Sequence, residues 1–366
     1  PDVWKKFFPH ESFVKLITNV VNVLNRLSKL NIWVEGSYGT GKSHAVITLK
    51  KLLEANLEET EAYFDEYATL NSDLKKKFIL AKQNGKIIVV HRYGSSSINS
   101  DNDLILAIQE SIESALKDEG INNVGIDALK TSVIRYLSDP ENKASFEIYV
   151  KGSYADLFGC DVDAIINNLQ DFEGIALQEL MRKIFKVANE KQIRAFSLDP
   201  KGLCNWIHHV IEENNLSGLI FIWDEFTEYL INNRNRLTGF QEIIELSQTD
   251  KFCFIPVTHK SEGLLEESIR NKTMGRFIKP TNQIELPENT AFQLMGAALK
   301  KKEILEDEWN EIVEDLQFRT CDSRRKIKNK VGIKDNELRG ILPIHPYSAY
   351  ILKHISASFN SDRKSV

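Results

Sequence analysis

Eight residues near the start of the chain, GSYGTGKS at 36–43, have the composition of a phosphate-binding loop. They fit the pattern GxxxxGK[ST], in which glycines let successive backbone N–H groups turn toward phosphate oxygens. Lys42 would reach the β- and γ-phosphates, and the Ser43 hydroxyl would take one position around Mg²⁺. A glycine turn can match by chance, but an apolar run at 32–34 precedes the loop and a helical pattern follows it. The sequence therefore predicts a nucleotide site with the candidate residues Gly36, Ser37, Tyr38, Gly39, Thr40, Gly41, Lys42, Ser43 and His44.

A pair of carboxylates forms the second chemical feature. Residues 219–223, LIFIW, have the pattern of a buried strand, and Asp224 and Glu225 follow directly. Ligands of open α/β sheets bind at the carboxyl ends of strands, so we expect this pair to face the loop. Asp224 would hold Mg²⁺ through water, and Glu225 would orient or polarise the attacking water. The alternative is an acidic start to the next loop, and nucleotide switches that do not hydrolyse can also retain both carboxylates.

The elements that must position these residues alternate between strands and helices. Apolar, β-branched runs predict strands at 32–34, 86–93, 218–226, 251–259 and 282–286. Helical patterns cover 11–30, 54–84, most of 98–216, and the chain after Pro287. This order predicts an α/β fold with a parallel sheet and helices on both faces. We expect a core over 1–290, with 98–216 as a helical insertion, and the start of a helical lid over 291–366.

The loop, the acidic strand end and a further strand that ends in Thr258 resemble the AAA+ superfamily of P-loop NTPases. The resemblance implies that a polar residue leaving the strand beside the acidic one senses the γ-phosphate. Thr258 matches that place, and His259 is the alternative. It also implies an arginine that reaches the nucleotide of a neighbouring subunit, for which Arg276 is the candidate and Arg270 the alternative. A residue simply leaving its strand and a solvated surface arginine are the competing readings.

A closer resemblance links the chain to the P-loop proteins of BREX-type phage-defence systems, the BrxC/PglY group. It rests on three phrases, GSYGTGKSH, IWDEFTEYL and LPIHPYSAYILKHISASFNSDRKSV. It implies an ATP- and Mg²⁺-dependent protein that works with other copies of itself and other defence proteins in a cytoplasmic assembly. A link to DNA comes from the resemblance, because the net charge of −5 provides no general attraction to nucleic acid.

Composition excludes several other classes of protein. The four cysteines are widely spaced, which argues against a disulfide framework or a zinc site. No apolar run reaches the ~18 residues of a membrane span.

The basic run at 323–330 has two interpretations. The first is a solvated surface of the lid, and the second is a contact to the phosphate backbone of a nucleic acid. Pro1 at the start and a helical pattern near the last residue lead us to expect a fragment of a longer protein.

Three functional hypotheses remain open on the sequence alone. The first is an ATPase that hydrolyses slowly within an oligomer. The second is a scaffold in which bound nucleotide stabilises one arrangement without hydrolysis. The third, a monomeric P-loop kinase, would need a site for a small-molecule acceptor, and the sequence shows no such site.

Overall fold

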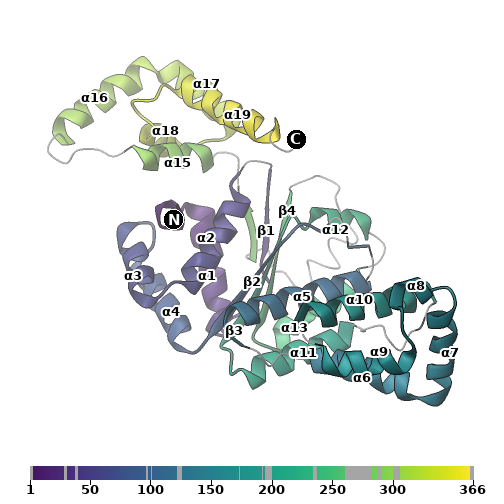
Figure 1. Cartoon of the computed structure of the whole chain (residues 1–366). Helices are drawn as coiled ribbons and strands as arrows, with labels where there is room; N and C mark the ends of the chain where they lie inside the picture. The colour runs from purple at the N-terminus through teal and green to yellow at the C-terminus, as the bar shows by residue number, and fades with distance from the viewer. Residues whose placement is uncertain are drawn as a thin grey trace. The chain divides into compact units, whose positions relative to one another are not determined.

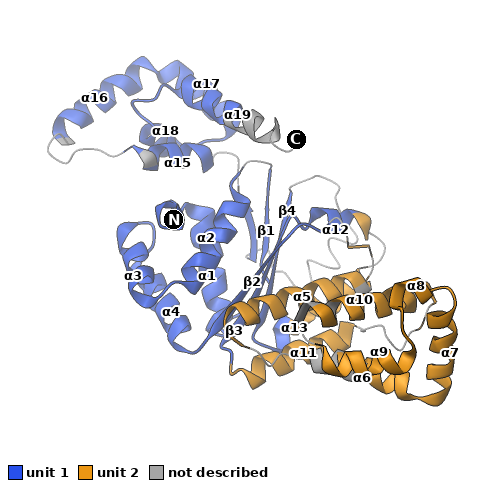
Figure 2. Ribbon diagram, in the orientation of Figure 1, with its two compact units in different colours: residues 1–95, 216–231, 247–366 blue, residues 96–215, 232–246 orange. Residues whose placement is uncertain are grey.

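The computed structural model describes residues 3–28, 31–37, 40–95, 98–99, 101–121, 126–172, 174–191, 193, 200–233, 237–259, 282–286, 290–299 and 306–362. The chain divides into two compact units (Figure 2). Unit 1 comprises 1–95, 216–231 and 247–366, and unit 2 comprises 96–215 and 232–246. The expected insertion at 98–216 therefore matches the larger segment of unit 2. Unit 2 also takes in 232–246, which the sequence patterns had left in the core.

A five-stranded parallel sheet forms the centre of unit 1 (Figure 1). Its strands are β1 (Trp33–Gly36), β2 (Ile87–Tyr93), β3 (Gly218–Asp224), β4 (Phe252–His259) and β5 (Gln283–Leu286). They lie in the order β2-β3-β4-β1-β5, and every pairing is parallel. The predicted α/β class, the five strands and their parallel direction are thus confirmed. Because β4 lies between β1 and β3, the carboxyl ends of these three strands are neighbours at one edge of the sheet.

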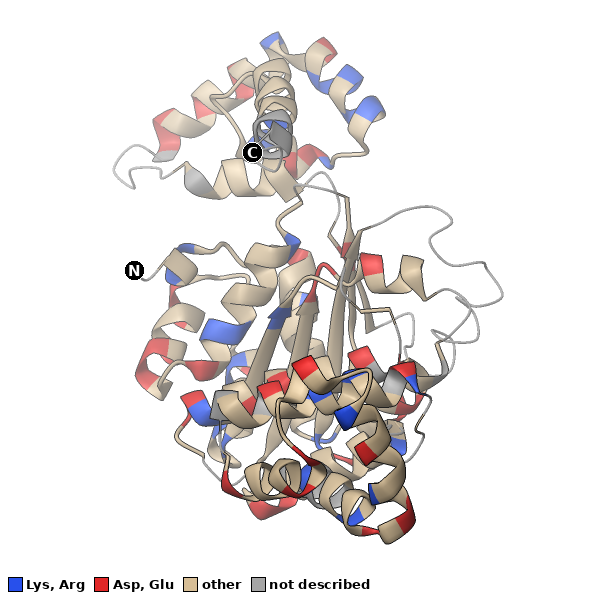
Figure 3. Cartoon of the chain, turned by 45° about the vertical axis from the view of Figure 1, so that its right-hand side comes forward, with Lys and Arg blue, Asp and Glu red and all other residues tan. Residues whose placement is uncertain are grey.

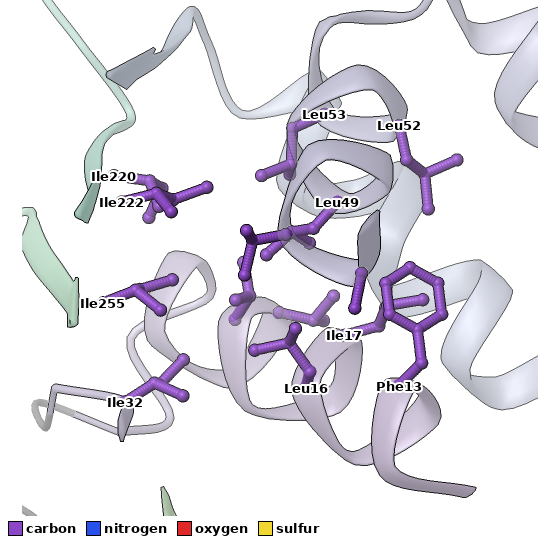
Figure 4. Close-up of a cluster of buried hydrophobic side chains, with 14 of the residues drawn as sticks. Phe13, Leu16, Ile17, Ile32, Leu49, Leu52, Leu53, Ile220, Ile222 and Ile255 are labelled. Atoms are coloured by element: carbon purple, nitrogen blue, oxygen red, sulfur yellow. The ribbon is translucent and has the colours of Figure 1, made fainter. Parts of the chain in front are cut away.

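The two faces of the sheet carry different side chains, because residues of a strand alternate between faces. Ile220, Ile222 and Ile255 lie on the face covered by α1 (Glu11–Leu24) and α2 (Lys42–Glu54). Figure 4 shows them opposite Leu16, Leu49 and Leu53 of these helices. The intervening residues are aromatic: the rings of Phe221 and Phe254 stack 5.3 Å apart at an interplanar angle of 8°.

Three helices within residues 1–95 have other bounds than the sequence patterns predict. The helix expected at 11–30 ends at Leu24, and the stretch 54–84 forms two helices, α3 (Leu57–Glu66) and α4 (Ser72–Gln83). Each of the two begins after an asparagine. The Asn56 side chain accepts from the N–H of Glu59, and Asn71 accepts from the N–H of Leu74. These N-caps supply partners for backbone donors at a helix start, which is why the stretch divides at residues 67–71.

A buried histidine caps the start of α1. The Nδ1 atom of His10 accepts from the backbone N–H of Phe13 at 3.4 Å, and the residue is 3% exposed. Burial lowers the pKa of His10 from 6.5 to about 4. The folded pKa lies below the unfolded one, so this contribution to stability is complete above pH 6.5 and is lost as the pH falls toward 4.

We therefore predict that the lowered pKa of His10 makes the free energy of unfolding fall by about 2 kcal/mol between pH 7 and pH 5. Urea denaturation at each pH measures this change. His10→Asn keeps a side-chain acceptor at the N-cap but does not titrate in this range, so it is expected to remove that part of the slope. His209→Asn, at an exposed position of unit 2, is the control and should leave the slope unchanged. An unaltered slope in His10→Asn would contradict the assignment.

The only regular secondary structure in the described residues of unit 2 is helical. Its helices are α5 (Asp101–Asp118), α6 (Ile126–Ser138), α7 (Pro140–Lys151), α8 (Ala155–Phe158), α9 (Val162–Asp171), α10 (Gly174–Glu190), α11 (Pro200–Glu213) and most of α13 (Thr238–Thr249). Two apolar stripes are buried: Leu104, Ile108, Ile112 and Leu116 in α5, and Leu177, Leu180, Ile184 and Val187 in α10. Residues of α6, α7, α9 and α10 share one apolar core. The described helices of the insertion thus bury their apolar side chains against one another.

The segment 291–366, expected to form a helical lid and called the lid below, is mainly helical in its described residues and is grouped with unit 1. It consists of α15 (Thr290–Ala298), α16 (Glu306–Arg319), α17 (Cys321–Val331), α18 (Asp335–Gly340) and α19 (Pro346–Asp362). Its small core includes Phe292, Ile327, Leu338 and Ala349. Unit 1 also contains most of the short α12 (Thr227–Asn232). Among the described helices, none has both the length and the apolar character that crossing a bilayer requires.

Candidate functional site

The predicted phosphate loop connects β1 to α2. β1 ends at Gly36, and α2 begins at Lys42 behind Gly41, whose φ is +86°. A Cβ at Gly36 would lie 2.8 Å from the carbonyl oxygen of Leu286 and 2.8 Å from Oγ1 of Thr40, so no larger residue fits there without movement. No side-chain cap hydrogen bond is made at Gly41, and a helix N-terminus is in general a favourable place for an anion. Tyr38 and Gly39 lie outside the described residues.

Lys42 is buried at the start of α2 and points back into the loop. It is 8% exposed, and its Nζ donates to the carbonyl oxygens of Gly36 and Ser37 at 2.9 Å each. A third neighbour is Nδ1 of His259 at 3.4 Å. These contacts hold the ammonium inside the loop, at the place where the motif predicts contact with a terminal phosphate. Ser43 is half-buried, and the ring of the exposed His44 packs against Phe7 with 5.0 Å between centroids.

The acidic pair lies at the end of β3, and its two members differ in environment. Asp224 is 2% exposed; its Oδ1 accepts from the N–H of Glu225 at 2.9 Å. Its Oδ2 is buried and has no hydrogen-bond partner among the described residues. Glu225 has a φ of +58°, a conformation that non-glycine residues seldom adopt. The Ser95 hydroxyl at the end of β2 donates to the Glu225 carbonyl at 2.8 Å, and Gly94 N–H donates to the Asp224 carbonyl at 2.9 Å. These two bonds hold the unusual bend.

The donor set at this edge fits a hard divalent cation such as Mg²⁺. A buried carboxylate oxygen without a partner costs free energy unless a cation or water satisfies it, and Oδ2 of Asp224 is such an atom. Among the described residues, no group of three or more His, Cys, Asp or Glu side chains is placed to hold a metal. A magnesium ion at Asp224 and Ser43 would therefore complete its shell with water and phosphate oxygens, as Mg²⁺ commonly does.

The two residues proposed to sense phosphate, Thr258 and His259, have different surroundings. Thr258 is 3% exposed, and its hydroxyl accepts from Nε1 of Trp33 at 2.9 Å. His259 lies opposite Gly36 in the pairing of β4 with β1. Its Nε2 is 2.9 Å from Oε2 of Glu225, and its Nδ1 faces Lys42. One imidazole thus spans the distance between the loop lysine and the acidic strand end.

The two arginine candidates, Arg270 and Arg276, lie outside the described residues. Two arginines of the lid have partners within the lid. In the lid, Arg319 pairs with Asp315 at 2.7 Å, and Arg324 donates to the carbonyl of Asp335 at 3.4 Å. Neither contact involves the loop.

A cavity of about 520 Å³ in unit 1 is lined by Phe8 and His10 and by lid residues including Phe292 and Lys334. Phe8 and His10 directly precede α1. No described residue of the phosphate loop is among those that line the cavity. The cavity is therefore a separate feature from the phosphate site.

Two residues of the site were not identified in the sequence. Ser95 supports Glu225, and the Thr227 hydroxyl accepts from the N–H of His259 at 2.8 Å. Both follow a predicted strand within three residues, so their position near a carboxyl end was the available signal. No model of a known protein family matches the sequence.

Proposed function

We propose that the chain is an AAA+-like P-loop ATPase that binds Mg·ATP at the carboxyl ends of β1, β4 and β3 and hydrolyses it. The supporting observation is the contact series from Lys42 through His259 to Glu225, next to the unpartnered buried oxygen of Asp224. This series joins a phosphate-binding group to a carboxylate that can act on water. The position of β4 between β1 and β3 agrees with the resemblance, which requires a polar residue on the strand beside the acidic one.

Each residue has a defined role in this proposal. The loop N–H groups and Lys42 bind the β- and γ-phosphates and stabilise the charge that develops on them. Ser43 and Asp224 would hold Mg²⁺, which when bound neutralises charge on the β- and γ-phosphates. Glu225 accepts a proton from the attacking water while the water oxygen bonds to the γ-phosphorus. The bond from that phosphorus to the β–γ bridging oxygen breaks, and its electron pair leaves with ADP.

The surroundings of the two candidate sensors favour His259 over Thr258. The Thr258 hydroxyl accepts from Trp33 and lies on the other face of β4, whereas the His259 ring borders Lys42. We therefore assign the contact to the terminal phosphate to His259. The decisive measurement for the whole proposal is multiple-turnover phosphate release from Mg·ATP. ATP binding without any phosphate release, with and without DNA, would support the nucleotide-gated scaffold instead.

Asp224→Asn is predicted to remove most of the effect of magnesium on ATP affinity. The ratio of the dissociation constants in EDTA and in Mg²⁺ is expected to fall by about 10-fold or more, since one charged contact of this kind contributes ~1.5–3 kcal/mol. The asparagine oxygen can still accept from the N–H of Glu225, so the bend is retained. Asp73→Asn, at an exposed position of α4, is the control. An unchanged ratio in Asp224→Asn would remove Asp224 from the metal site.

Assembly with other copies, action with other defence proteins and contact with DNA are further parts of the proposal. The resemblance supports them, and Arg276 would act only in an oligomer. The distribution of charge limits where DNA could bind. Residues 96–215 contain 20 acidic and 11 basic residues, and this acidic excess would repel the phosphate backbone. The basic side chains of α17 in the lid are the better candidate (Figure 3), namely Arg324, Arg325, Lys326, Lys328 and Lys330.

A further inference from the structure

The lid carries its negative and positive charges on two different helices (Figure 3). The exposed residues of α16 include the carboxylates of Asp307, Glu308, Glu311, Glu314 and Asp315. The exposed residues of α17 include the basic side chains of Arg325, Lys326, Lys328 and Lys330. Arg319 pairs with Asp315 within α16, and Arg325 pairs with Asp322 within α17, but exposed ion pairs of this kind contribute little. The lid therefore presents two surfaces of opposite charge.

The acidic surface also contains large apolar side chains. Asp307, Glu311, Glu314 and Phe318 recur at steps of four, three and four residues, so they share one face of α16. The Phe318 side chain is 80% exposed, and Ile312 beside this row is exposed as well. We call these five residues the acidic face. Contact with an apolar partner would remove its aromatic ring from water.

The basic surface adjoins an apolar stripe on α19. Lys326 and Lys330 lie one turn apart on α17, and the Nζ atom of Lys330 lies 5.0 Å from the ring centroid of Tyr350 on α19. The exposed apolar side chains of α19 next to Tyr350 are Tyr347, Ile351, Leu352 and Ile355. Their spacing places them on one side of the helix. We call the two lysines and this stripe the basic face.

The two faces are complementary in both charge and apolar character. A contiguous exposed apolar patch with a charged border is typical of a protein–protein interaction surface. The phosphate backbone of a nucleic acid would pair with the two lysines, but it offers no apolar partner to the stripe of α19. The acidic face of a second copy offers carboxylates to the lysines and Phe318 and Ile312 to the stripe, so a second copy is the better fit.

We propose that the acidic face of one lid binds the basic face of the lid of a second copy of this chain. Because the two faces lie on different helices, one copy can use its acidic face with one neighbour and its basic face with another, in a head-to-tail arrangement. This inference goes beyond ATP hydrolysis, since it needs no nucleotide. It names the surface that assembly with other copies, a part of the proposed function, would use.

The test measures self-association of the chain by sedimentation velocity without nucleotide, at several protein and salt concentrations. The two-site variants Glu311→Lys/Glu314→Lys and Lys326→Glu/Lys330→Glu each place like charges opposite one another. Each should weaken association by about 10-fold or more. The four-site variant restores opposite charges and should associate within about 3-fold of the wild type. A mixture of the two two-site variants should also associate, because the altered and the unaltered faces then match in pairs.

Two further variants separate the interface from general effects. Phe318→Ser changes no charge and should also weaken association, while the exposed position leaves the helix content unchanged in circular dichroism. Glu61→Lys/Glu66→Lys makes the same change of net charge at exposed positions of α3 and should leave association unaltered.

Three results would overturn the inference: a wild-type chain that is monomeric at every concentration measured, unchanged association in both two-site variants, or no recovery in the four-site variant. If Lys326→Glu/Lys330→Glu lost binding to a short DNA duplex but kept its self-association, the basic face would be a nucleic-acid surface instead. Lys42→Ala should associate like the wild type. A failure of the proposed ATP site therefore leaves this test unaffected, and the two failures can be told apart.

Discussion

Lys42→Ala is expected to weaken binding of Mg·ATP by roughly 100-fold or more while the chain stays folded. The lysine would make charge-assisted bonds to the β- and γ-phosphates, and each bond of this kind contributes ~1.5–3 kcal/mol. Two such bonds correspond to roughly a 100- to 10,000-fold change in the dissociation constant. The constant can be measured by calorimetry or by fluorescence titration with a labelled ATP analogue.

The control for this variant lies on the same helix. Lys51 is half exposed and pairs with Glu54 at the surface, so Lys51→Ala should change ATP affinity by less than about 2-fold. Lys42 also holds the loop carbonyls of Gly36 and Ser37, so the melting temperature of Lys42→Ala should fall slightly. An ATP affinity equal to that of the wild type would show that the loop is not the phosphate site, whatever the thermal result.

Glu225→Gln is expected to lower kcat for ATP hydrolysis by ~100- to 10,000-fold, the usual contribution of a positioned general base. The amide has the shape of the carboxylate and can still accept from Nε2 of His259. It cannot take a proton from water. ATP should therefore remain bound, and single-turnover experiments should show the nucleotide retained as ATP.

Glu228→Gln is the matched control for this second variant, because it removes an exposed carboxylate from the neighbouring helix α12. Its kcat should stay within about 3-fold of the wild type, as is usual for surface changes away from a site. If Glu225→Gln turned over ATP at the wild-type rate, the base would have to be another group.

The main features of the fold could be predicted because they depend on local patterns. β3 and β4 are apolar runs that end at a polar residue, and such runs mark parallel strands buried on both faces. Helix boundaries were less predictable, since they depend on which side chain accepts from a backbone N–H. The division of 54–84 at Asn71 is one example. The inclusion of 232–246 in unit 2 is another, because no local pattern encodes the partners of a helix.

The sequence alone could not decide whether Thr258 or His259 borders the phosphate loop. Adjacent residues of a strand point to opposite faces, so only one of the two can border the loop. The pairing of β4 with β1 determines which of the two borders the loop. His259 lies opposite Gly36, where the loop begins, and Thr258 accepts a hydrogen bond from Trp33. That register depends on contacts between segments more than 200 residues apart, and it is not visible in either segment alone.

The sequence by itself determined the chemistry that is possible: glycines and a lysine suited to phosphate, two carboxylates after an apolar strand, and the alternation of strands and helices. These properties belong to residue types and to short spacings, and short spacings are local. Only the tertiary structure decided that Lys42, His259 and Glu225 form one series of contacts and that one oxygen of Asp224 is buried without a partner. Long-range strand pairing brings these residues together, because the sheet places the ends of β1, β4 and β3 side by side.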